Sequence, residues 1–380
     1  MAEAAIPVAV IGGGVVGVAV AHALARRGVA ALVLEAEDEL ARAASGTNSG
    51  ILHTGFDSAP GALETMLIQR SASLRDAFLA SSGVPVLRCG ATLTPRDMQQ
   101  ACAVAAVAAT ALANGVEATL RDDGALELPG EAVTDPVAYT RALAGETIAA
   151  GAEIRTGARV EAIARLSGAL TLGLAGGDAV SCRLAVNCAG LHADRVARLV
   201  GDESFTIFPR KGEFLVFDPP GGTPLERILL PIPTKRTKGV LVFPTTDGKV
   251  VAGPTAHDQT DKHDWSVRDR AREEILPHAV AMLPELEGAE PVGSWAGLRP
   301  AGRGANYVIG RSAACPNLIN VAAIRSTGLS AALGIGEHVT ALVERAGIAP
   351  GAVERRAPGP MAVADRPWWQ RAAERSREAP

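Results

Sequence analysis

The chain has 380 residues, more than one small core usually organises, and 48% of them are hydrophobic, so we expect a globular protein of two domains. Its net charge of −4 and the lack of a Lys/Arg run with interleaved aromatics argue against a nucleic-acid partner. The five cysteines are odd in number and form no CxxC pair, which argues against a disulfide framework and a zinc site.

Two stretches bear on where the protein works. The opening carries an acid where a secretory signal needs a basic region, and glycines interrupt its apolar run. The apolar stretch 101–113 is shorter than the ~20 residues that span a bilayer. We therefore expect a cytoplasmic protein without a transmembrane segment, for which homo-oligomer formation or peripheral membrane contact stays open.

The first elements read as strand, turn, helix and strand. Residues 7–11 form a short apolar run that enters glycines. Helical spacing then continues to Leu24 and ends near Gly28, a glycine suited to a helix C-terminus, before the apolar run 31–34. This order predicts the start of an α/β domain.

The middle of the chain continues in the same alternating way. We expect a helix over 136–150 and extended segments at 152–154 and 158–163. A buried strand at 184–188 then leads into a helix at Gly190. These pieces fit the first domain although they lie far from its start in the sequence.

A different pattern is inserted between these pieces. Residues 213–217 and 240–243 read as strands, and the pair Asp247-Gly248 between two apolar runs indicates a hairpin. An antiparallel sheet is therefore expected here. A buried strand at 319–323 and a helix over 328–343 then return to the first domain.

The glycines after the first strand form the motif G-x-G-x-x-G. Gly12 turns the chain, Gly14 lets a pyrophosphate approach the backbone, and Gly17 lets the helix pack on the strand. The helix N-terminus favours the diphosphate anion. Glu35 closes the next strand, where a carboxylate can bind the ribose hydroxyls. This arrangement predicts a dinucleotide site.

The segment SGTNSGILHTGFD, residues 45–57, indicates which dinucleotide is bound. It breaks the regular strand and helix alternation that a nicotinamide domain would continue. Its glycines and small hydroxylic residues suit a backbone pressed against the ribityl chain and isoalloxazine of a flavin. We therefore expect FAD rather than NAD.

Seven segments carry a resemblance to a known family. The sequence resembles the glycine-oxidase and D-amino-acid-oxidase (DAO) superfamily of FAD enzymes, in the branch with L-2-hydroxyglutarate and glycerol-3-phosphate dehydrogenases. The matching segments are IGGGVVGVAVAHALARRG, SGTNSGILHTGF, TGARVEAI, NCAGLHADRVA, PRKGEFLVFD, WAGLRP and IRSTGLSAALGIGEHV.

The resemblance implies an α/β fold in which a Rossmann-type, glutathione-reductase-like FAD domain carries an inserted α+β substrate domain built on an antiparallel sheet. The expected limits are 1–80, 145–205 and 290–345 for the discontinuous FAD domain, 81–144 and 206–289 for the substrate domain, and 346–380 for a tail.

The resemblance also implies the cofactor contacts. The backbone of Val160 would face the adenine, Ala189 and Gly190 would lie by the pyrophosphate, and the helix start at 328–330 would face the N1–C2=O edge of the flavin. No cysteine closely follows GLRP, so the FAD is expected to be non-covalent. The expected FAD-binding residues are Gly12, Gly14, Val15, Val16, Gly17, Glu35, Ala36, Ser45, Asn48, Ser49, Gly50, Val160, Ala189, Gly190, Gly297, Gly328, Leu329 and Ser330.

Oxidation of a secondary alcohol needs a base for the hydroxyl proton while hydride moves to flavin N5, and histidine is the usual choice. By the resemblance, His53 in NSGILHTG would be this base. Arg299 and Arg325 would take part in catalysis by holding an anionic group of the substrate, with an internal ion pair as the alternative for each. Lys211 and Lys238 are weaker candidates for substrate binding.

The other polar clusters favour structural roles. His192 begins a helix after a strand at the nucleotide side, which favours a structural histidine. His257, Asp261 and His263 crowd into HDQTDKHD, but their spacing matches no established metal site, so we expect a solvated loop and no metal.

Three functions compete. The preferred one is an FAD enzyme that oxidises the CH–OH group of a small anion such as L-2-hydroxyglutarate or glycerol 3-phosphate. The second is an amine or amino-acid oxidase of the same fold, which needs no strong base. The third is a flavoprotein or flavin-free subunit of a larger dehydrogenase, docked through Trp368 and Trp369 of the tail, which is otherwise simply a packed terminus.

The route by which electrons leave is open. The anaerobic glycerol-3-phosphate enzymes of this branch carry a cysteine-rich extension for an iron–sulfur centre, and this chain shows none. The expected acceptor is therefore oxygen, a quinone or a carrier protein.

Overall fold

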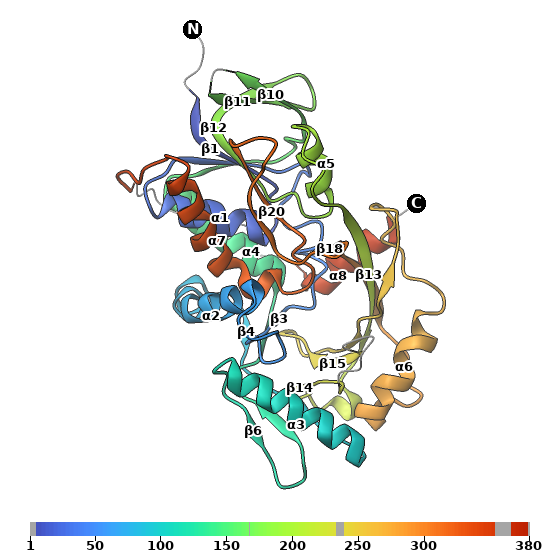
Figure 1. The fold of residues 1–380 in the computed structure, drawn as a ribbon. Helices are drawn as coiled ribbons and strands as arrows, with labels where there is room; N and C mark the ends of the chain where they lie inside the picture. The colour runs from blue at the N-terminus through green and yellow to red at the C-terminus, as the bar shows by residue number, and fades with distance from the viewer. Residues whose placement is uncertain (1–4, 167, 233–238, 354–365, 379–380) are drawn as a thin grey trace.

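The computed structural model describes residues 5–166, 168–232, 239–353 and 366–378 (Figure 1). In this described part, a first sheet of eight strands has the order β10-β11-β12-β1-β2-β9, and β20 joins it between β12 and β19. The pairs among β9, β2, β1, β12 and β20 are parallel. Its strands are β1 (Ile6–Ile11), β2 (Ala31–Leu34), β9 (Glu153–Arg155), β10 (Val160–Leu166), β11 (Ala169–Leu174), β12 (Ala179–Asn187), β19 (Val308–Arg311) and β20 (Leu318–Ala322).

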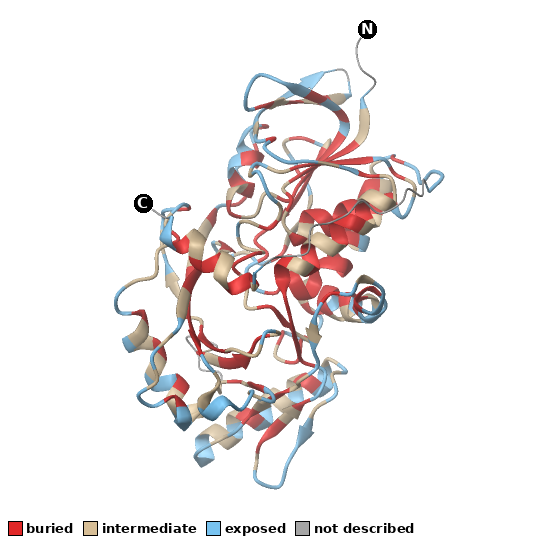
Figure 2. Cartoon of the chain, turned by 180° about the vertical axis from the view of Figure 1, so that it is seen from behind, coloured by how far each residue is buried: buried red, intermediate tan, exposed pale blue. Residues whose placement is uncertain are grey.

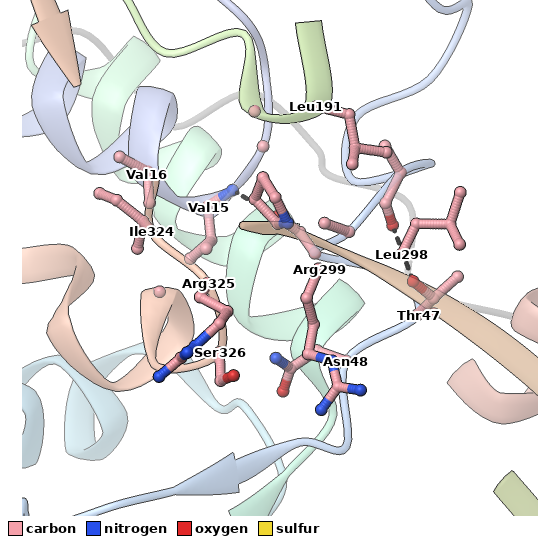
Figure 3. Close-up of a pocket in the computed structure, with 18 of the residues that line it drawn as sticks. Val15, Val16, Thr47, Asn48, Leu191, Leu298, Arg299, Ile324, Arg325 and Ser326 are labelled. Carbon is pink, nitrogen blue, oxygen red and sulfur yellow. Dashed lines mark hydrogen bonds between the residues drawn. The ribbon is translucent and has the colours of Figure 1, made fainter. Parts of the chain in front are cut away.

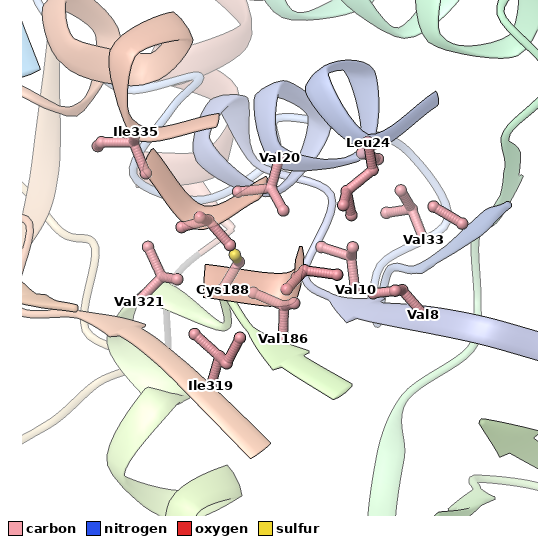
Figure 4. Packing of buried hydrophobic residues seen from close by; sticks show 14 of the residues in the cluster. Val8, Val10, Val20, Leu24, Val33, Val186, Cys188, Ile319, Val321 and Ile335 are labelled. Atoms are coloured by element: carbon pink, nitrogen blue, oxygen red, sulfur yellow. The ribbon is translucent and has the colours of Figure 1, made fainter. Parts of the chain in front are cut away.

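The central strands β1, β2 and β20 are almost continuously apolar and are buried on both faces of the first sheet, whereas the outer strands β9 and β10 are largely exposed. Val8 and Val10 of β1 face the layer of helices, whereas Ala9 and Ile11 face the opposite side, which β11 and α5 cover. Figure 4 shows the helix-side layer, where Val20 meets the strands. The helices of the described chain are α1 (Val15–Ala25), α2 (Leu63–Ser82), α3 (Met98–Ala113), α4 (Pro136–Ala149), α5 (Ala193–Arg198), α6 (Ala271–Met282), α7 (Gly328–Arg345) and α8 (Trp368–Arg377).

Close helix packing on this sheet depends on glycine. Helix α7 lies between α1 and α2. A Cβ on Gly336 would come within 2.4 Å of the Ala19 carbonyl oxygen of α1, and one on Gly334 within 2.2 Å of the Leu67 carbonyl oxygen of α2. Glycine at these two positions therefore allows α7 to pack closely against both α1 and α2.

A second sheet of nine strands in the described part contains the long pair β13 and β18, antiparallel along ten residue pairs. The predicted hairpin is confirmed, because β15 and β16 pair on either side of Gly248, whose φ is 83°. Its strands are β5 (Ala91–Leu93), β6 (Thr119–Leu120), β7 (Leu126–Leu128), β13 (Ile207–Phe217), β14 (Ile228–Leu229), β15 (Leu241–Pro244), β16 (Val250–Gly253), β17 (His257–Asp258) and β18 (Gly293–Gly302).

A small third sheet joins β3 (Ile51–Leu52), β8 (Ala132–Thr134) and β4 (Val86–Leu87). It places the segment after β3 next to the turn between β7 and β8. Helix α4 starts beyond this sheet, where the Asp135 carboxylate accepts the N–H groups of Val137 and Ala138 at 2.8 Å each and Pro136 occupies the first turn.

The predicted α/β fold is confirmed, and the second sheet is antiparallel except for the parallel pair β5 and β14. The predicted domain limits stay a prediction. Helix α4 runs through the limit between 144 and 145, and β18 from the segment 290–345 pairs with β13 of the second sheet. Figure 2 shows that the first sheet and the helices beside it are mostly buried. No helix among the described residues has both the length and the apolar character needed to cross a membrane.

The C-terminal tail packs on the molecule where it is described. Trp368 and Trp369 at the start of α8 are 1% and 6% exposed. The ring of Trp368 meets that of Trp295 in β18 edge to face, with centroids 5.0 Å apart. The packed terminus, one of the two expectations for this segment, is therefore what residues 366–378 form.

Candidate functional site

A cavity of about 900 Å³ lies between the first and second sheets (Figure 3). Its walls come from the loop between β1 and α1, the segment 41–57, the start of α7, and strands β13, β15 and β18. Segments that are far apart in the sequence thus share one site. The volume lies in the upper range of ligand pockets in proteins.

The glycine loop is built for close backbone approach. Gly12 has a φ of 113°, and a Cβ there would lie 2.5 Å from the Cys188 carbonyl oxygen. A Cβ on Gly17 would lie 1.9 Å from the Gly12 carbonyl oxygen, so this glycine lets α1 pack on the turn. Gly14 precedes α1 and gives no side-chain cap, and the Val15 N–H donates to Ser45 Oγ at 3.0 Å.

Glu35 at the end of β2 is fixed beside this loop. Its Oε2 accepts the Gly13 N–H at 2.5 Å, and its Oε1 accepts the Glu37 N–H at 2.9 Å. Burial raises the pKa of the Glu35 carboxyl, which these backbone hydrogen bonds oppose. Glu35 lines the cavity at the end of β2.

Most of the predicted FAD-binding residues line the cavity. Gly17, Gly50 and Ser330 do not line it. Gly17 packs against the turn, and Gly50, with a φ of 78°, lies against the Thr134 carbonyl. Ser330 Oγ accepts the His53 N–H at 2.8 Å. The lining residues among them are Gly12, Gly14, Val15, Val16, Glu35, Ala36, Ser45, Asn48, Ser49, Val160, Ala189, Gly190, Gly297, Gly328 and Leu329.

The donors around the cavity fit an anionic dinucleotide. The buried Nε of Arg42 has no hydrogen-bond partner among the described residues, and Arg42 lines the cavity. The 18-residue helix α7 begins at Gly328, so its N-terminal N–H groups meet the cavity wall. A second helix N-terminus, that of α1, follows the glycine loop.

His53 follows β3, lines the cavity and is held from behind by a buried carboxylate. Its Nδ1 lies 2.8 Å from Oε2 of Glu131, which is fully buried. The other oxygen, Oε1, accepts the N–H of Thr54 at 2.7 Å and its hydroxyl at 2.8 Å. When Nδ1 carries the ring proton, it donates a hydrogen bond to Glu131 Oε2. The other ring nitrogen, Nε2, is then the one that can accept a proton.

Sequence reasoning missed Glu131. It lies in the turn between β7 and β8, 78 residues from His53, within LPGEAV, where an acid reads as an ordinary loop residue. To predict the contact of Glu131 with His53, one would have to predict that β3 pairs with β8, because this pairing brings the two turns together. Short strands of two and three residues leave too little pattern to predict that pairing.

Arg299 and Arg325 line the same cavity (Figure 3). Arg299 Nε donates to the Arg210 carbonyl at 3.1 Å, and its Nη2 donates to the carbonyls of Lys211 and Thr255 at 3.1 and 2.8 Å. Burial lowers the pKa of Arg299 to about 10, with smaller contributions from the positive charges of Arg210 and Arg325. The Arg299 guanidinium is therefore cationic at neutral pH.

Neither arginine forms the alternative internal ion pair among the described residues. The hydrogen bonds of Arg299 within the described chain all go to backbone carbonyls, and none of them uses Nη1. Arg325 is exposed to the cavity and makes no hydrogen bond with a described residue. Both guanidinium groups thus keep donors for an anion.

The structure places Lys211 elsewhere. It is 2% exposed, and its Nζ lies 2.8 Å from Asp264 Oδ2 and 2.9 Å from the Ser266 carbonyl, away from the cavity lining. This geometry argues against its predicted role in substrate binding, because strand alternation points Arg210 and Gly212 to the cavity instead. Lys238 lies outside the described residues.

The other three histidines singled out in the sequence, His192, His257 and His263, form two contacts. His192 and His263 line the cavity with ring centroids 5.4 Å apart, and burial lowers the pKa of His192 to about 4. His257 Nε2 lies 2.7 Å from Glu274 Oε2, near Glu213, in the described group whose spacing would suit a metal ion. Arg268 pairs with both carboxylates there, so this group is an ion-pair network.

Known proteins resemble this chain over most of its length. A family model described as FAD dependent oxidoreductase (DAO) matches residues 7–342. Glycerol 3-phosphate dehydrogenase of Caloramator mitchellensis is 28% identical over 348 residues, which cover 87% of this chain and 72% of that protein. Mitochondrial L-2-hydroxyglutarate dehydrogenase of Mus musculus is 27% identical over 276 residues, or 65% of this chain and 60% of that protein.

A solved structure gives the same fold. Dithionite-reduced L-α-glycerophosphate oxidase from Mycoplasma pneumoniae, with FAD bound, superposes with a TM-score of 0.84 at 22% identity. The match covers 93% of this chain and 97% of that one. The described chain therefore shares the fold of that structure over nearly its whole length.

Proposed function

We infer the reaction of this protein from one premise: the chain belongs to the FAD-dependent oxidoreductase (DAO) family, whose model matches residues 7–342. The proposed reaction is oxidation of the CH–OH group of a small anionic donor, either a 2-hydroxy acid such as L-2-hydroxyglutarate or glycerol 3-phosphate. The relatives named glycerol 3-phosphate dehydrogenase and L-2-hydroxyglutarate dehydrogenase support this donor class. When bound, FAD supplies a hydride acceptor at flavin N5.

One observation carries the proposal. A histidine whose Nδ1 is held by the buried Glu131 lines the same cavity as the dinucleotide loop and two arginines. His53 takes the hydroxyl proton on Nε2, and Glu131 stabilises the imidazolium that forms. Arg299 and Arg325 hold the anionic group of the donor and orient its CH–OH carbon.

FAD in this proposal is held by the predicted residues that line the cavity. The glycine loop and the α1 N-terminus receive the diphosphate, and Glu35 binds the ribose. The start of α7 directs its N–H groups toward negative charge. The electron acceptor, the oligomeric state and a cytoplasmic location stay predictions.

The test is anaerobic reduction of the bound flavin. The purified yellow protein is mixed with L- and D-2-hydroxyglutarate, other 2-hydroxy acids, glycerol 3-phosphate, glycine and sarcosine, and bleaching of the flavin absorbance is followed. Bleaching by a hydroxy acid or glycerol 3-phosphate supports the proposal. Bleaching by glycine or sarcosine alone would favour the amine oxidase, and a protein without flavin would favour a binding subunit.

The variant His53→Ala tests the proposed base. Its rate of flavin reduction should fall about 10²- to 10⁴-fold, while FAD stays bound, because the proton acceptor is lost. The matched control is His278→Ala, which removes an exposed histidine of α6 far from the lining and should leave the rate unchanged. Equal rates in both variants would favour the amine oxidase, which needs no strong base.

A further inference from the structure

The C-terminal helix α8 lies beyond the segment that matches the family model, residues 7–342, and returns to the cavity. It is fixed on the second sheet by its own contacts. Ser376 Oγ accepts the N–H of Ala296 in β18 at 2.9 Å, and Trp369 Nε1 donates to Asp247 Oδ2 at 3.0 Å. The side chains of α8 that face inward therefore have defined positions.

Arg375 is the residue of α8 that lines the cavity. Its guanidinium lies 4.5 Å from the ring centroid of Trp265, which also lines the cavity, and its Nη2 lies 3.3 Å from Glu37 Oε1. The side chain is 16% exposed. Trp265 and Glu37 thus hold the guanidinium from two sides at the wall.

The donors of Arg375 are incompletely used. A guanidinium has five N–H donors, and the contact with Glu37 is a single long one. Its Nε is buried and has no hydrogen-bond partner among the described residues. The rest of the guanidinium lies at the cavity wall and keeps N–H donors for an acceptor that the cavity receives.

Arg42, Arg159 and Arg195 also line the cavity, together with the acids Glu35, Glu37 and Glu161. Arg42 reaches the end of α8, where its Nη2 lies 3.3 Å from Glu378 Oε2. Glu37 follows Glu35, the residue beside the glycine loop, so Arg375 is tied to the nucleotide side of the cavity rather than to His53. The ligand chemistry that fits is a phosphate anion.

We propose that α8 is part of the cofactor site and that Arg375 binds the diphosphate of FAD. The inference rests on the proposed function only in taking FAD as the ligand. The tail then contributes a wall to the dinucleotide site, and the Trp pair at its start anchors that wall to β18. A purely structural Arg375 would instead only brace Trp265 and Glu37.

The first experiment measures FAD affinity. Apoprotein is titrated with FAD, and quenching of flavin fluorescence gives the dissociation constant for wild type, Arg375→Met and Arg377→Met. Arg375→Met should raise the dissociation constant about 10- to 100-fold, the worth of a charged hydrogen bond. Arg377, two residues along α8, is exposed and outside the lining, so Arg377→Met should match wild type. Equal constants for all three proteins would overturn the proposal.

The second experiment separates phosphate binding from bracing. ADP and adenosine compete with FAD for each apoprotein. Loss of ADP affinity with adenosine affinity unchanged supports a diphosphate contact, whereas equal loss of both would overturn it. Arg375→Lys keeps a cation on a flexible stem and should therefore retain part of the ADP affinity that Arg375→Met loses. The Lys variant also replaces the Met variant in both experiments if the Met variant fails to fold.

The outcomes also separate this inference from the proposed reaction. If wild type binds FAD and is bleached by a hydroxy acid but Arg375→Met binds FAD equally well, only the role of Arg375 fails. If Arg375→Met loses FAD affinity but no hydroxy acid or glycerol 3-phosphate bleaches wild type, only the proposed donor class fails.

Discussion

The Glu131 carboxylate divides its two oxygens between neighbours in the same turn. Oε1 accepts two hydrogen bonds from Thr54, and Oε2 faces the imidazole of His53. Because Thr54 follows His53 directly, this arrangement fixes the backbone and the ring together. A histidine at a cavity wall thereby acquires one orientation and one tautomer.

The variant Glu131→Gln should lower kcat about 10²-fold or more and leave the KM of the donor nearly unchanged. The amide oxygen can still accept from Thr54, but the NH₂ group then faces Nδ1 of His53, so the ring proton moves to Nε2 and the base is lost. Steady-state kinetics check this split. Thr54→Val, which removes one hydroxyl donor to Glu131, is the control and should change kcat little.

His22 makes stability depend on pH. It is 9% exposed in α1, with Nδ1 buried and unpartnered in the described chain, and burial lowers its pKa to about 4. Between pH 6.5 and about 4 the unfolded state binds this proton and the folded state does not, so stability falls as pH falls through this window. The expected slope is on the order of 1 kcal/mol per pH unit.

Urea unfolding at pH 7 and pH 5 measures this effect. His22→Gln should lose less stability than wild type on acidification, because its side chain does not titrate. His192, whose pKa is also lowered to about 4, acts in the same direction and remains in the variant. An equal loss in both proteins would show that His22 does not contribute.

The sequence predicted single residues best where a local motif dictates the backbone. Gly12 and Gly17 occupy the positions that their spacing required, because the turn admits no Cβ at either one. The geometry argues against the predicted role of Lys211, because the sequence carries no signal of which face of β13 its side chain takes. Glu131 escaped notice because its partner comes from a distant turn.

At the level of elements, the packing of α7 rests on small residues. Gly336→Ala places a methyl group 2.4 Å from the Ala19 carbonyl oxygen, which α1 cannot yield without moving. We expect a loss of about 1–3 kcal/mol in the free energy of unfolding, measured by urea denaturation. Gly310→Ala in β19, where a Cβ meets open space, should leave the midpoint unchanged.

Elements with a strong apolar pattern were predicted closely. β2 was expected at 31–34 and lies there, and α7 was expected over 328–343 and runs to Arg345. The helix expected at Gly190 is a 3₁₀ turn, Gly190–His192, followed by the short α5. Apart from β9, which was expected at 152–154 and lies at Glu153–Arg155, the two- and three-residue strands were not predicted, because their pairing comes from the tertiary fold.

For the molecule as a whole, the cavity joins the first and second sheets, so an occupant that binds both should stabilise them together. Removal of FAD should lower the free energy of unfolding by about 4 kcal/mol relative to protein with FAD at a thousand times its dissociation constant. Urea midpoints of apoprotein and reconstituted protein check this. Identical midpoints would mean that the ligand does not bind the native fold.

The nucleotide half of the molecule could be predicted because strand, glycine loop, helix and acid follow one another within the chain. The other half of the cavity could not. Its walls come from β13, β15 and β18, the turn holding Glu131, and α8, and the fold alone brings these together. The resemblance identified His53, Arg299 and Arg325 as candidates but gave no account of what holds them.

The order of strands in the first sheet has a consequence for biosynthesis. β1 and its glycine loop leave the ribosome before the elements that complete their surroundings. The later elements are β12 and β20, which extend the sheet beside β1, and α7, which covers the sheet. A nascent polypeptide halted before α7 lacks one wall of the cavity. Capture of the flavin is therefore expected only after α7 has been synthesised, and fragments stalled before it should emerge colourless.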